Sequence, residues 1–196
     1  MRVLMLSLDT TILEKDSAVQ RRLLALAEAI GRGEEKIPRL ADSALPLGKG
    51  ELSVFVPGER DEKRNISPHL TVYSFGGTKW LQLWKMWRRG KRLLTFNFSP
   101  LTTVDLITVQ DTGYLALLGY LLARKHRIPL EVQVHGFEKM RGVRERLARF
   151  VLCRAGKIRV VSQRLQSFLK SEILPARLWR SGGNLKSDIY VLPVYT

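Results

Sequence analysis

The sequence predicts a doubly wound α/β fold, a Rossmann-like parallel sheet of about seven strands with helices on both faces. The main observation is the stretch Val104–Gly136, which reads VDLITVQD, TGYLALLGYLLARKHR and IPLEVQVHG. Its outer pieces are short apolar runs typical of buried strands, and its middle piece spaces leucines as an amphipathic helix does. Apolar runs of both kinds also alternate along the whole chain, which favours parallel strands joined by right-handed crossovers.

The first half of the chain supplies three of the expected strands and two of the expected helices. The strands are expected at residues 2–8, 52–58 and 70–75. Asp16 or Ser17 can cap the helix that follows the first strand, and Gly31 and Gly33 stop that helix. Two charged or polar segments, 34–50 and 59–68, are expected as a loop and a surface turn. The second helix contains KWLQLWKMWRRGKRLL.

The second half completes the alternation after the strand–helix–strand unit. A helix is expected at residues 142–155, and a second helix, which Ser162 can cap, at 163–170. Strands are expected at 157–162 and 188–194, with a loop rich in Pro and Gly at 175–187. The sequence contains no internal repeat and no low-complexity segment.

Length and composition indicate an ordinary globular protein. The 196 residues suit one domain or one half of a two-domain enzyme, and 45% hydrophobic residues suffice for a core. No apolar run approaches the roughly 20 residues that span a bilayer. The single Cys153 excludes an internal disulfide, and no Cys/His cluster suggests zinc. We therefore expect no metal, no cofactor and a cytoplasmic location.

The charge is unusual, because 33 Lys and Arg residues face 18 Asp and Glu residues, for a net charge of +15. Such a surface attracts polyanions, whether nucleic acid or anionic lipid. The cations spread over several helices, and no RRM, KH or zinc signature is present, which makes nucleic acid the less favoured partner.

Three common motifs of α/β enzymes are absent. The loop after the first strand, LDTTILEKDSA, lacks the Gly-x-Gly-x-x-Gly of dinucleotide-binding proteins, and neither a P-loop nor a Gly-x-Ser-x-Gly is found. Polar residues do follow two apolar strands, as Gln110-Asp111 and His135-Gly136. Ligands of open parallel sheets bind outside the carboxyl ends of the strands, so these pairs indicate a site there.

Taken in order, these segments resemble the N-terminal domain of family 4 glycosyltransferases of the GT-B fold. The resemblance covers nearly the whole chain and depends most on VQD, VQVHG and RVVS at their mutual spacing. It implies an acceptor-binding domain, a second Rossmann domain that holds most of the nucleotide-sugar, and transfer without an obligatory metal. The chain departs from the family in lacking the Gly-Gly of the first loop. It also ends where a donor domain would follow, so we expect it to be one half of a cut or split enzyme.

The resemblance also implies roles for single residues. His135 would face the cleft beside the transferred sugar and act at the reacting centre. Gln110 and Asp111 would line the acceptor side, and the loop from Asp9 to Ser17 would approach the donor diphosphate or the acceptor. The full expected set of cleft residues is Asp9, Asp16, Ser17, Gln110, Asp111, Gly136 and Ser162.

Several of these residues also have a purely structural interpretation. His135 could satisfy loop backbone groups, and Asp111 could cap the helix that starts at Thr112-Gly113. Asp16 is favoured as a helix cap over a base. Gln110 and Asp111 would point to opposite faces if the strand continued through both, so that one of them reaches the cleft.

The helix with three tryptophans allows two interpretations. Trp80, Trp84 and Trp87 share one face, which is favoured as core packing against a sheet. Tryptophan beside dense positive charge is also typical of a helix at an anionic membrane surface, and lipid-linked acceptors are common in the family. The membrane candidates are Lys79, Lys85, Arg88, Arg89, Lys91 and Arg92.

Two functional hypotheses follow. The first is the acceptor-binding half of a glycosyltransferase, whose partners are a nucleotide-sugar, a glycan or lipid-linked acceptor and a C-terminal Rossmann domain or separate subunit. The second is a non-catalytic basic module that binds a partner subunit, an anionic membrane surface or nucleic acid. A membrane role would place the protein on the inner face of the plasma membrane.

Overall fold

The computed structural model describes residues 1–32, 50–95, 104–136, 142–173 and 188–191. Across these ranges eight strands form one sheet in the order β3-β4-β2-β1-β5-β6-β7-β8. The pairing is antiparallel between β3 and β4 and parallel between β1 and β2, β2 and β4, and along β5 to β8. The predicted α/β fold with a mostly parallel sheet is confirmed. The chain divides into two compact units, Met1–Leu106 and Ile107–Thr196, which are described in turn.

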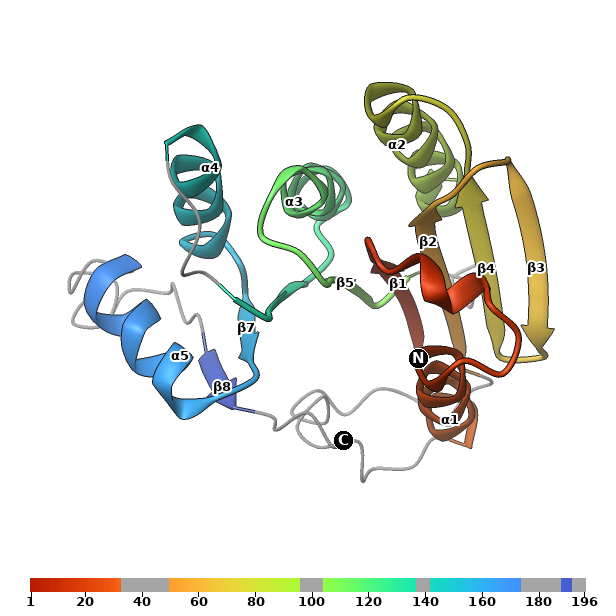
Figure 1. The fold of residues 1–196 in the computed structure, drawn as a ribbon, viewed down its shortest axis with the longest axis horizontal. Coiled ribbons are helices and arrows are strands. Elements are labelled where there is room, and N and C mark those ends of the chain that lie inside the picture. The colour runs from red at the N-terminus through yellow and green to blue at the C-terminus, as the bar shows by residue number, and fades with distance from the viewer. Residues whose placement is uncertain (33–49, 96–103, 137–141, 174–187, 192–196) are drawn as a thin grey trace. The chain divides into compact units, whose positions relative to one another are not determined.

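The first unit contains a small sheet with helices on its two faces (Figure 1). The strands are β1 (Arg2–Leu6), β2 (Glu51–Pro57), β3 (Glu62–Ser67) and β4 (Leu70–Phe75). The helices are the 3-10 turn η1 (Thr10–Leu13), α1 (Ala18–Arg32) and α2 (Lys79–Thr95). The strands and helices expected in this half of the chain are therefore confirmed, with small shifts at their ends.

Alternation along β2 divides the core of this unit between the two helices. Leu52, Val54 and Val56 belong to a buried cluster with Ala27 and Ile30 of α1. Phe55 points to the opposite face, where its ring packs edge-on against Tyr73 and Phe75 at centroid distances of 5.4 and 5.1 Å. This second face is the side on which α2 lies (Figure 1).

The charged segment 59–68 does not form only a surface turn as expected. Residues Glu62–Ser67 are strand β3, which pairs antiparallel with β4 in the register Glu62↔Ser74 and Arg64↔Val72. The strand is at the edge of the sheet, where both of its faces can stay in water. It therefore carries no apolar alternation, and the usual sequence signal of a strand is missing.

The expectation that the tryptophans of α2 form its core face is wrong for two of them. Trp80 and Trp84 are 72% and 53% exposed, whereas the buried residues of the helix are Met86 and Gly90. These two buried residues are four apart and therefore lie on one side of the helix. Glycine has no side chain, so α2 can approach the sheet there and turn its tryptophans outward.

The second unit alternates strands and helices. Its strands are β5 (Leu106–Val109), β6 (Leu130–Val134), β7 (Lys157–Val160) and β8 (Asp188–Val191). Its helices are α3 (Tyr114–His126), α4 (Val143–Leu152), α5 (Gln163–Phe168) and the π turn η2 (Leu169–Ile173). The predicted strand–helix–strand unit is confirmed as β5-α3-β6, with Val109 paired to Val132 in parallel register.

Two expected loops lie largely outside the described residues, and one expected helix ends at a different residue. The loops expected at 34–50 and 175–187 lie outside the described residues, except Gly50. The last expected helix, 163–170, is shorter than predicted, because α5 ends at Phe168 and continues as the π turn η2.

Candidate functional site

Polar side chains follow three neighbouring parallel strands of the second unit. Gln110 comes directly after β5, His135 directly after β6, and Ser162 two residues after β7. Because the three strands are parallel neighbours, their carboxyl ends meet at one edge of the sheet. The predicted placement of these three residues at strand ends is therefore present in the fold.

His135 is exposed at the end of a buried strand. Desolvation by the surrounding protein lowers the pKa of its imidazole below 6.5, and the positive charge of Arg159 on β7 lowers it further. The ring is therefore neutral at pH 7, with one N–H donor and one acceptor nitrogen. The next residue, Gly136, is also exposed, and a Cβ built on it would meet nothing within 4 Å. A methyl group at Gly136 would thus contact none of the described residues.

A buried polar network lies on one face of β6, the strand that precedes His135. Glu131 and Gln133 are two apart in β6 and therefore point to one face, and Glu131 is 3% exposed. Glu131 Oε1 accepts hydrogen bonds from the Thr108 hydroxyl (3.0 Å) and the Gln133 amide (3.1 Å), and that amide also donates to Thr108 (3.0 Å). Glu131 Oε2 accepts from the hydroxyl of Tyr190 on β8.

Partial burial beside Glu131 raises the pKa of the Tyr190 phenol above its ordinary value of 10.0. Desolvation is the largest cause, followed by the negative charge of Glu131 and by the hydrogen bond that the neutral phenol donates to it. Sequence reasoning missed the network. Its signal was available in EVQV, where polar residues alternate with valines inside a strand that was expected to be simply apolar.

Asp111 forms a turn before α3 and not the helix cap that was one of its two interpretations, because the N-cap residue Gly113 has no side-chain cap hydrogen bond. Its carboxylate accepts a hydrogen bond from the backbone N–H of Gly113 at 2.9 Å, immediately before α3 begins at Tyr114. Strand β5 ends at Val109, so strand alternation does not extend through Gln110 and Asp111. Both side chains are partly exposed.

Ser162 also has a structural role. Its side chain accepts from the backbone N–H of Leu165 at 3.2 Å, which caps α5 as predicted.

The loop after β1, in the first unit, is organised by side-chain caps. Asp9 accepts hydrogen bonds from the backbone N–H and hydroxyl of Thr11, at 3.0 and 2.6 Å, and so caps η1. Ser17 accepts from the backbone N–H of Gln20 at 3.0 Å and donates to the Thr11 carbonyl at 2.7 Å. The loop is thereby tied to the start of α1.

Asp16 is not the helix cap that it was expected to be. Its backbone is left-handed, with φ at 60°, and its N–H donates to the side chain of Gln20 at 3.0 Å. The residue itself is exposed. Ser17 takes the capping position instead, since its hydroxyl accepts from the N–H of Gln20, three residues later.

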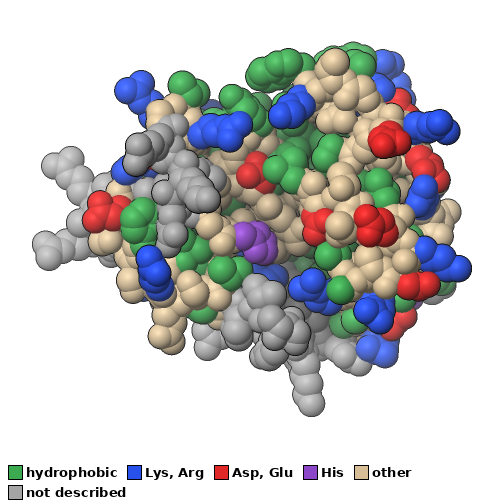
Figure 2. Space-filling view, in the orientation of Figure 1, with side chains coloured by type: hydrophobic (Ala, Val, Ile, Leu, Met, Phe, Trp, Pro, Cys, Tyr) green, Lys and Arg blue, Asp and Glu red, His purple; other side chains and the backbone are tan. Residues whose placement is uncertain are grey.

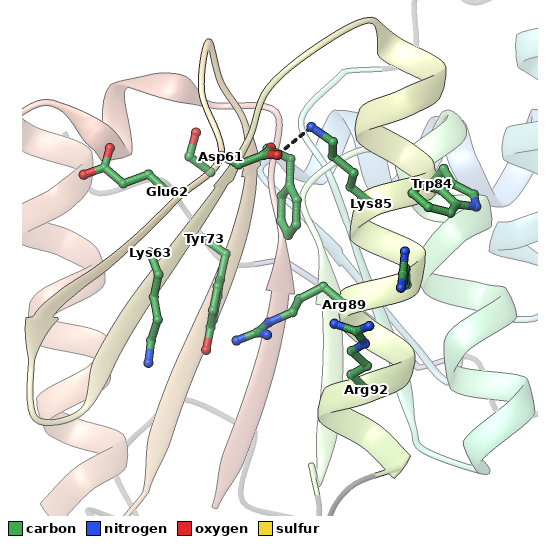
Figure 3. Close-up of a pocket in the computed structure, with 11 residues that line it drawn as sticks. Asp61, Glu62, Lys63, Tyr73, Trp84, Lys85, Arg89 and Arg92 are labelled. Atoms are coloured by element: carbon green, nitrogen blue, oxygen red, sulfur yellow. Dashed lines mark hydrogen bonds and ion pairs between the residues drawn. The ribbon is translucent and has the colours of Figure 1, made fainter.

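A second candidate site lies within the first unit, between α2 and the strands β3 and β4 (Figure 3). It is a cavity of about 530 Å³ lined by five cationic and two acidic side chains together with aromatic rings. Lys85 spans it with a 2.6 Å ion pair to Asp61 and a 2.9 Å hydrogen bond to the Gly76 carbonyl. That ammonium, through its hydrogen bond, and the Gly76 N–H hold the pKa of Asp61 below its usual range.

Most of the cationic residues predicted to face a membrane line this cavity. Lys85, Arg88, Arg89 and Arg92 line it, whereas Lys79 and Lys91 are not among its lining residues. Sequence reasoning grouped the six by composition and did not anticipate a cavity, because Asp61 and Tyr73 come from other elements. More widely, Lys and Arg side chains lie at many points of the face seen in Figure 2, beside Asp and Glu.

The described residues contain neither a cluster of metal ligands nor a helix that could cross a membrane. No group of three or more His, Cys, Asp or Glu side chains is arranged to hold a metal ion there. In the same ranges no helix has the length and apolar character needed to cross a membrane.

Comparison with known proteins gives matches among solved structures. Neither a protein-family model nor a curated protein matches the chain. A sucrose-phosphate synthase chain from Thermosynechococcus elongatus matches with a TM-score of 0.64 and 12% identity, over 100% of this chain and 90% of that one. The lipopolysaccharide outer core galactosyltransferase WaaB matches with a TM-score of 0.57 and 11% identity, over 97% and 45%. Anabaena HepE in complex with UDP matches with a TM-score of 0.51 and 14% identity, over 97% and 44%.

The fold is GT-B-like. This conclusion concerns the fold alone, since the identities are low. The chain spans about half of the longer chains it matches, including 49% of a second sucrose-phosphate synthase structure with a TM-score of 0.59 and 11% identity.

Proposed function

We propose that the chain is the acceptor-binding half of a GT-B glycosyltransferase resembling family 4, which transfers a sugar from a nucleotide-sugar to an acceptor hydroxyl. One observation carries the proposal: a GT-B-like fold presents Gln110, His135 and Ser162 at the carboxyl ends of neighbouring parallel strands. Two of the similar structures are a galactosyltransferase and a protein solved with UDP, which supports a nucleotide-sugar as co-substrate.

In the proposed reaction the acceptor oxygen bonds to the anomeric carbon while the bond from that carbon to the diphosphate oxygen breaks. His135 acts at the reacting centre as a neutral imidazole that can donate one hydrogen bond and accept another. Gln110, Asp111, Gly136 and Ser162 line the acceptor side, and the loop Asp9–Ser17 approaches the donor diphosphate or the acceptor. Catalysis rests on positioning and on stabilising the departing diphosphate, without a metal.

A second Rossmann domain, on the same chain or another subunit, would hold most of the donor. Residues 1–196 alone should therefore give little or no transfer, and measurable turnover by them would contradict the half-enzyme. A continuing or adjacent reading frame that encodes such a domain would supply the partner for activity measurements.

Acceptor binding can be tested on the chain itself by saturation-transfer NMR with a panel of soluble glycans. We expect a subset of glycans to bind, and His135→Ala to weaken that binding about tenfold or more, since ligand hydrogen bonds to a polar site are lost. His126→Ala is the matched control, because His126 ends α3 ahead of the amino end of β6. The proposal fails if no glycan binds, or if the two variants bind alike.

A second candidate function is a non-catalytic basic module that binds a partner subunit, an anionic membrane or nucleic acid. The exposure of Trp80 and Trp84 on the cationic helix α2 favours a membrane among these partners. It agrees with a cytoplasmic protein held at the inner face of the plasma membrane. Co-sedimentation with phosphatidylglycerol vesicles at physiological salt tests this role, with generic DNA as the comparison. Binding to DNA alone, or to neither, would exclude it.

A further inference from the structure

The cavity beside α2 contains more positive charge than its own carboxylates can neutralise. Asp61 is already paired with Lys85 at 2.6 Å and accepts a 2.8 Å hydrogen bond from the Gly76 N–H. Glu62 binds the guanidinium of Arg64 through two hydrogen bonds of 2.6 and 2.8 Å. Both acidic side chains of the cavity are therefore occupied.

The other cations of the cavity make no ion pair with any described residue. Arg89 and Lys63 lie over the ring of Tyr73, at 4.8 and 5.9 Å from its centroid, and Arg88 lies 5.4 Å from the ring of Trp84. Arg89 Nε is buried and has no hydrogen-bond acceptor among the described residues. A buried N–H without an acceptor costs free energy, so this position favours an anion that can accept from it.

Arg89 and Arg92 both line the cavity from the α2 side. Figure 3 shows both extending from successive turns of α2, with the guanidinium group of Arg89 directed at Tyr73 and that of Arg92 nearer the helix. Two arginines on one wall offer the paired N–H donors that fit the oxygens of a tetrahedral oxyanion. Lys63 and the Tyr73 hydroxyl come from the opposite wall, on β3 and β4.

We propose that this cavity binds the phosphate group of a phosphorylated small molecule or of a lipid headgroup. Its volume of about 530 Å³ exceeds what a phosphate alone needs and lies in the usual range of ligand pockets. Phe75 and Trp84 line the same cavity and supply apolar surface for the rest of the ligand. All lining residues belong to Met1–Leu106, so the site is independent of the proposed acceptor site of the second unit.

The test is calorimetric titration of the whole chain with inorganic pyrophosphate and, separately, with phosphatidic acid vesicles. Arg92→Gln and Arg89→Gln should each weaken binding about tenfold, because each removes a charge-assisted hydrogen-bond donor. Arg92 is exposed, so its replacement keeps the test valid if loss of the Arg89–Tyr73 contact impairs folding. Lys91→Gln is the matched control, because it removes one charge from the same helix outside the cavity.

Each outcome decides the proposal. Pyrophosphate binding that is lost in Arg92→Gln and kept in Lys91→Gln supports a soluble phosphorylated ligand. The same pattern with vesicles alone supports a lipid headgroup. Equal losses in Arg92→Gln and Lys91→Gln would show non-specific attraction to the surface and overturn the proposal, as would an absence of binding to both probes.

Discussion

Replacing Tyr190 by Phe tests the buried network of the second unit with a single atom. The Tyr190 hydroxyl donates to Glu131 Oε2, whereas the Thr108 and Gln133 side chains both donate to Oε1. Among the described side chains, no other hydrogen bond to Oε2 is found. The substitution therefore leaves half of a carboxylate that is 3% exposed without its donor, while the packing of the ring is unchanged.

The expected loss of stability follows from this geometry. A hydrogen bond to a charged group contributes about 1.5–3 kcal/mol, and leaving a buried acceptor unsatisfied costs a similar amount. Tyr190 is only partly buried, so water can replace some of the lost interaction. We expect the free energy of unfolding to fall by about 2 kcal/mol.

Urea unfolding at pH 7 measures this loss, with Tyr120→Phe as the control. The Tyr120 hydroxyl takes part in one long contact of 3.4 Å with Arg124, so its removal should cost about 0.5 kcal/mol or less. If the two variants unfold within about 0.5 kcal/mol of each other, the network does not stabilise the unit as argued.

The stability of the same variant should also depend differently on pH in the alkaline range. The folded pKa of Tyr190 lies above the ordinary 10.0, so the folded protein keeps a proton that the unfolded chain releases. This stabilising contribution is complete below pH 10 and is lost as pH rises through the folded pKa. Tyr190→Phe should therefore show a shallower loss of stability above pH 10 than the parent, and parallel pH profiles would contradict the assignment.

Two further predictions concern His135 and the glycines. The imidazole of His135 should titrate below pH 6.5 in the folded protein and near pH 6.5 in urea. Its contribution to stability is therefore present above pH 6.5 and is lost as pH falls. NMR measures both midpoints, and a folded midpoint above pH 6.5 would refute the prediction. Gly76→Ala places a Cβ 2.5 Å from the Glu59 carbonyl oxygen and should cost about 1–3 kcal/mol. Gly136→Ala meets nothing within 4 Å and should change stability by less than about 0.5 kcal/mol, and equal losses in the two alanine variants would contradict this reasoning.

The elements that could be predicted are those in which the local spacing of apolar residues indicates which side chains are buried. Strand β6 and helix α3 were recognisable because an apolar strand and a helix of the 3.6-residue period bury their side chains in different sequence patterns. The helix cap at Ser162 was equally local, because it requires only the N–H of Leu165 three residues later. In both cases the chain nearby contains all the information needed.

The features that could not be predicted depend on partners far along the chain. Strand β3 is recognisable only by its pairing with β4, since an edge strand need not bury either face. The tryptophans of α2 were assigned to the core because they share one face at helical spacing, yet the helix packs through Met86 and Gly90. The cavity beside α2 brings together Asp61 and Lys85, which are 24 residues apart.

The cavity shows where part of the net charge of +15 is concentrated. Two of the seven charged side chains of the cavity are acids that Lys85 and Arg64 already neutralise, so the excess at this position belongs to Arg88, Arg89, Arg92 and Lys63. Total charge attracts any polyanion, but guanidinium groups that line a cavity together with aromatic rings select by shape as well. Residues such as Lys91, which carry the same charge outside the cavity, therefore provide the comparison that separates specific recognition from general attraction.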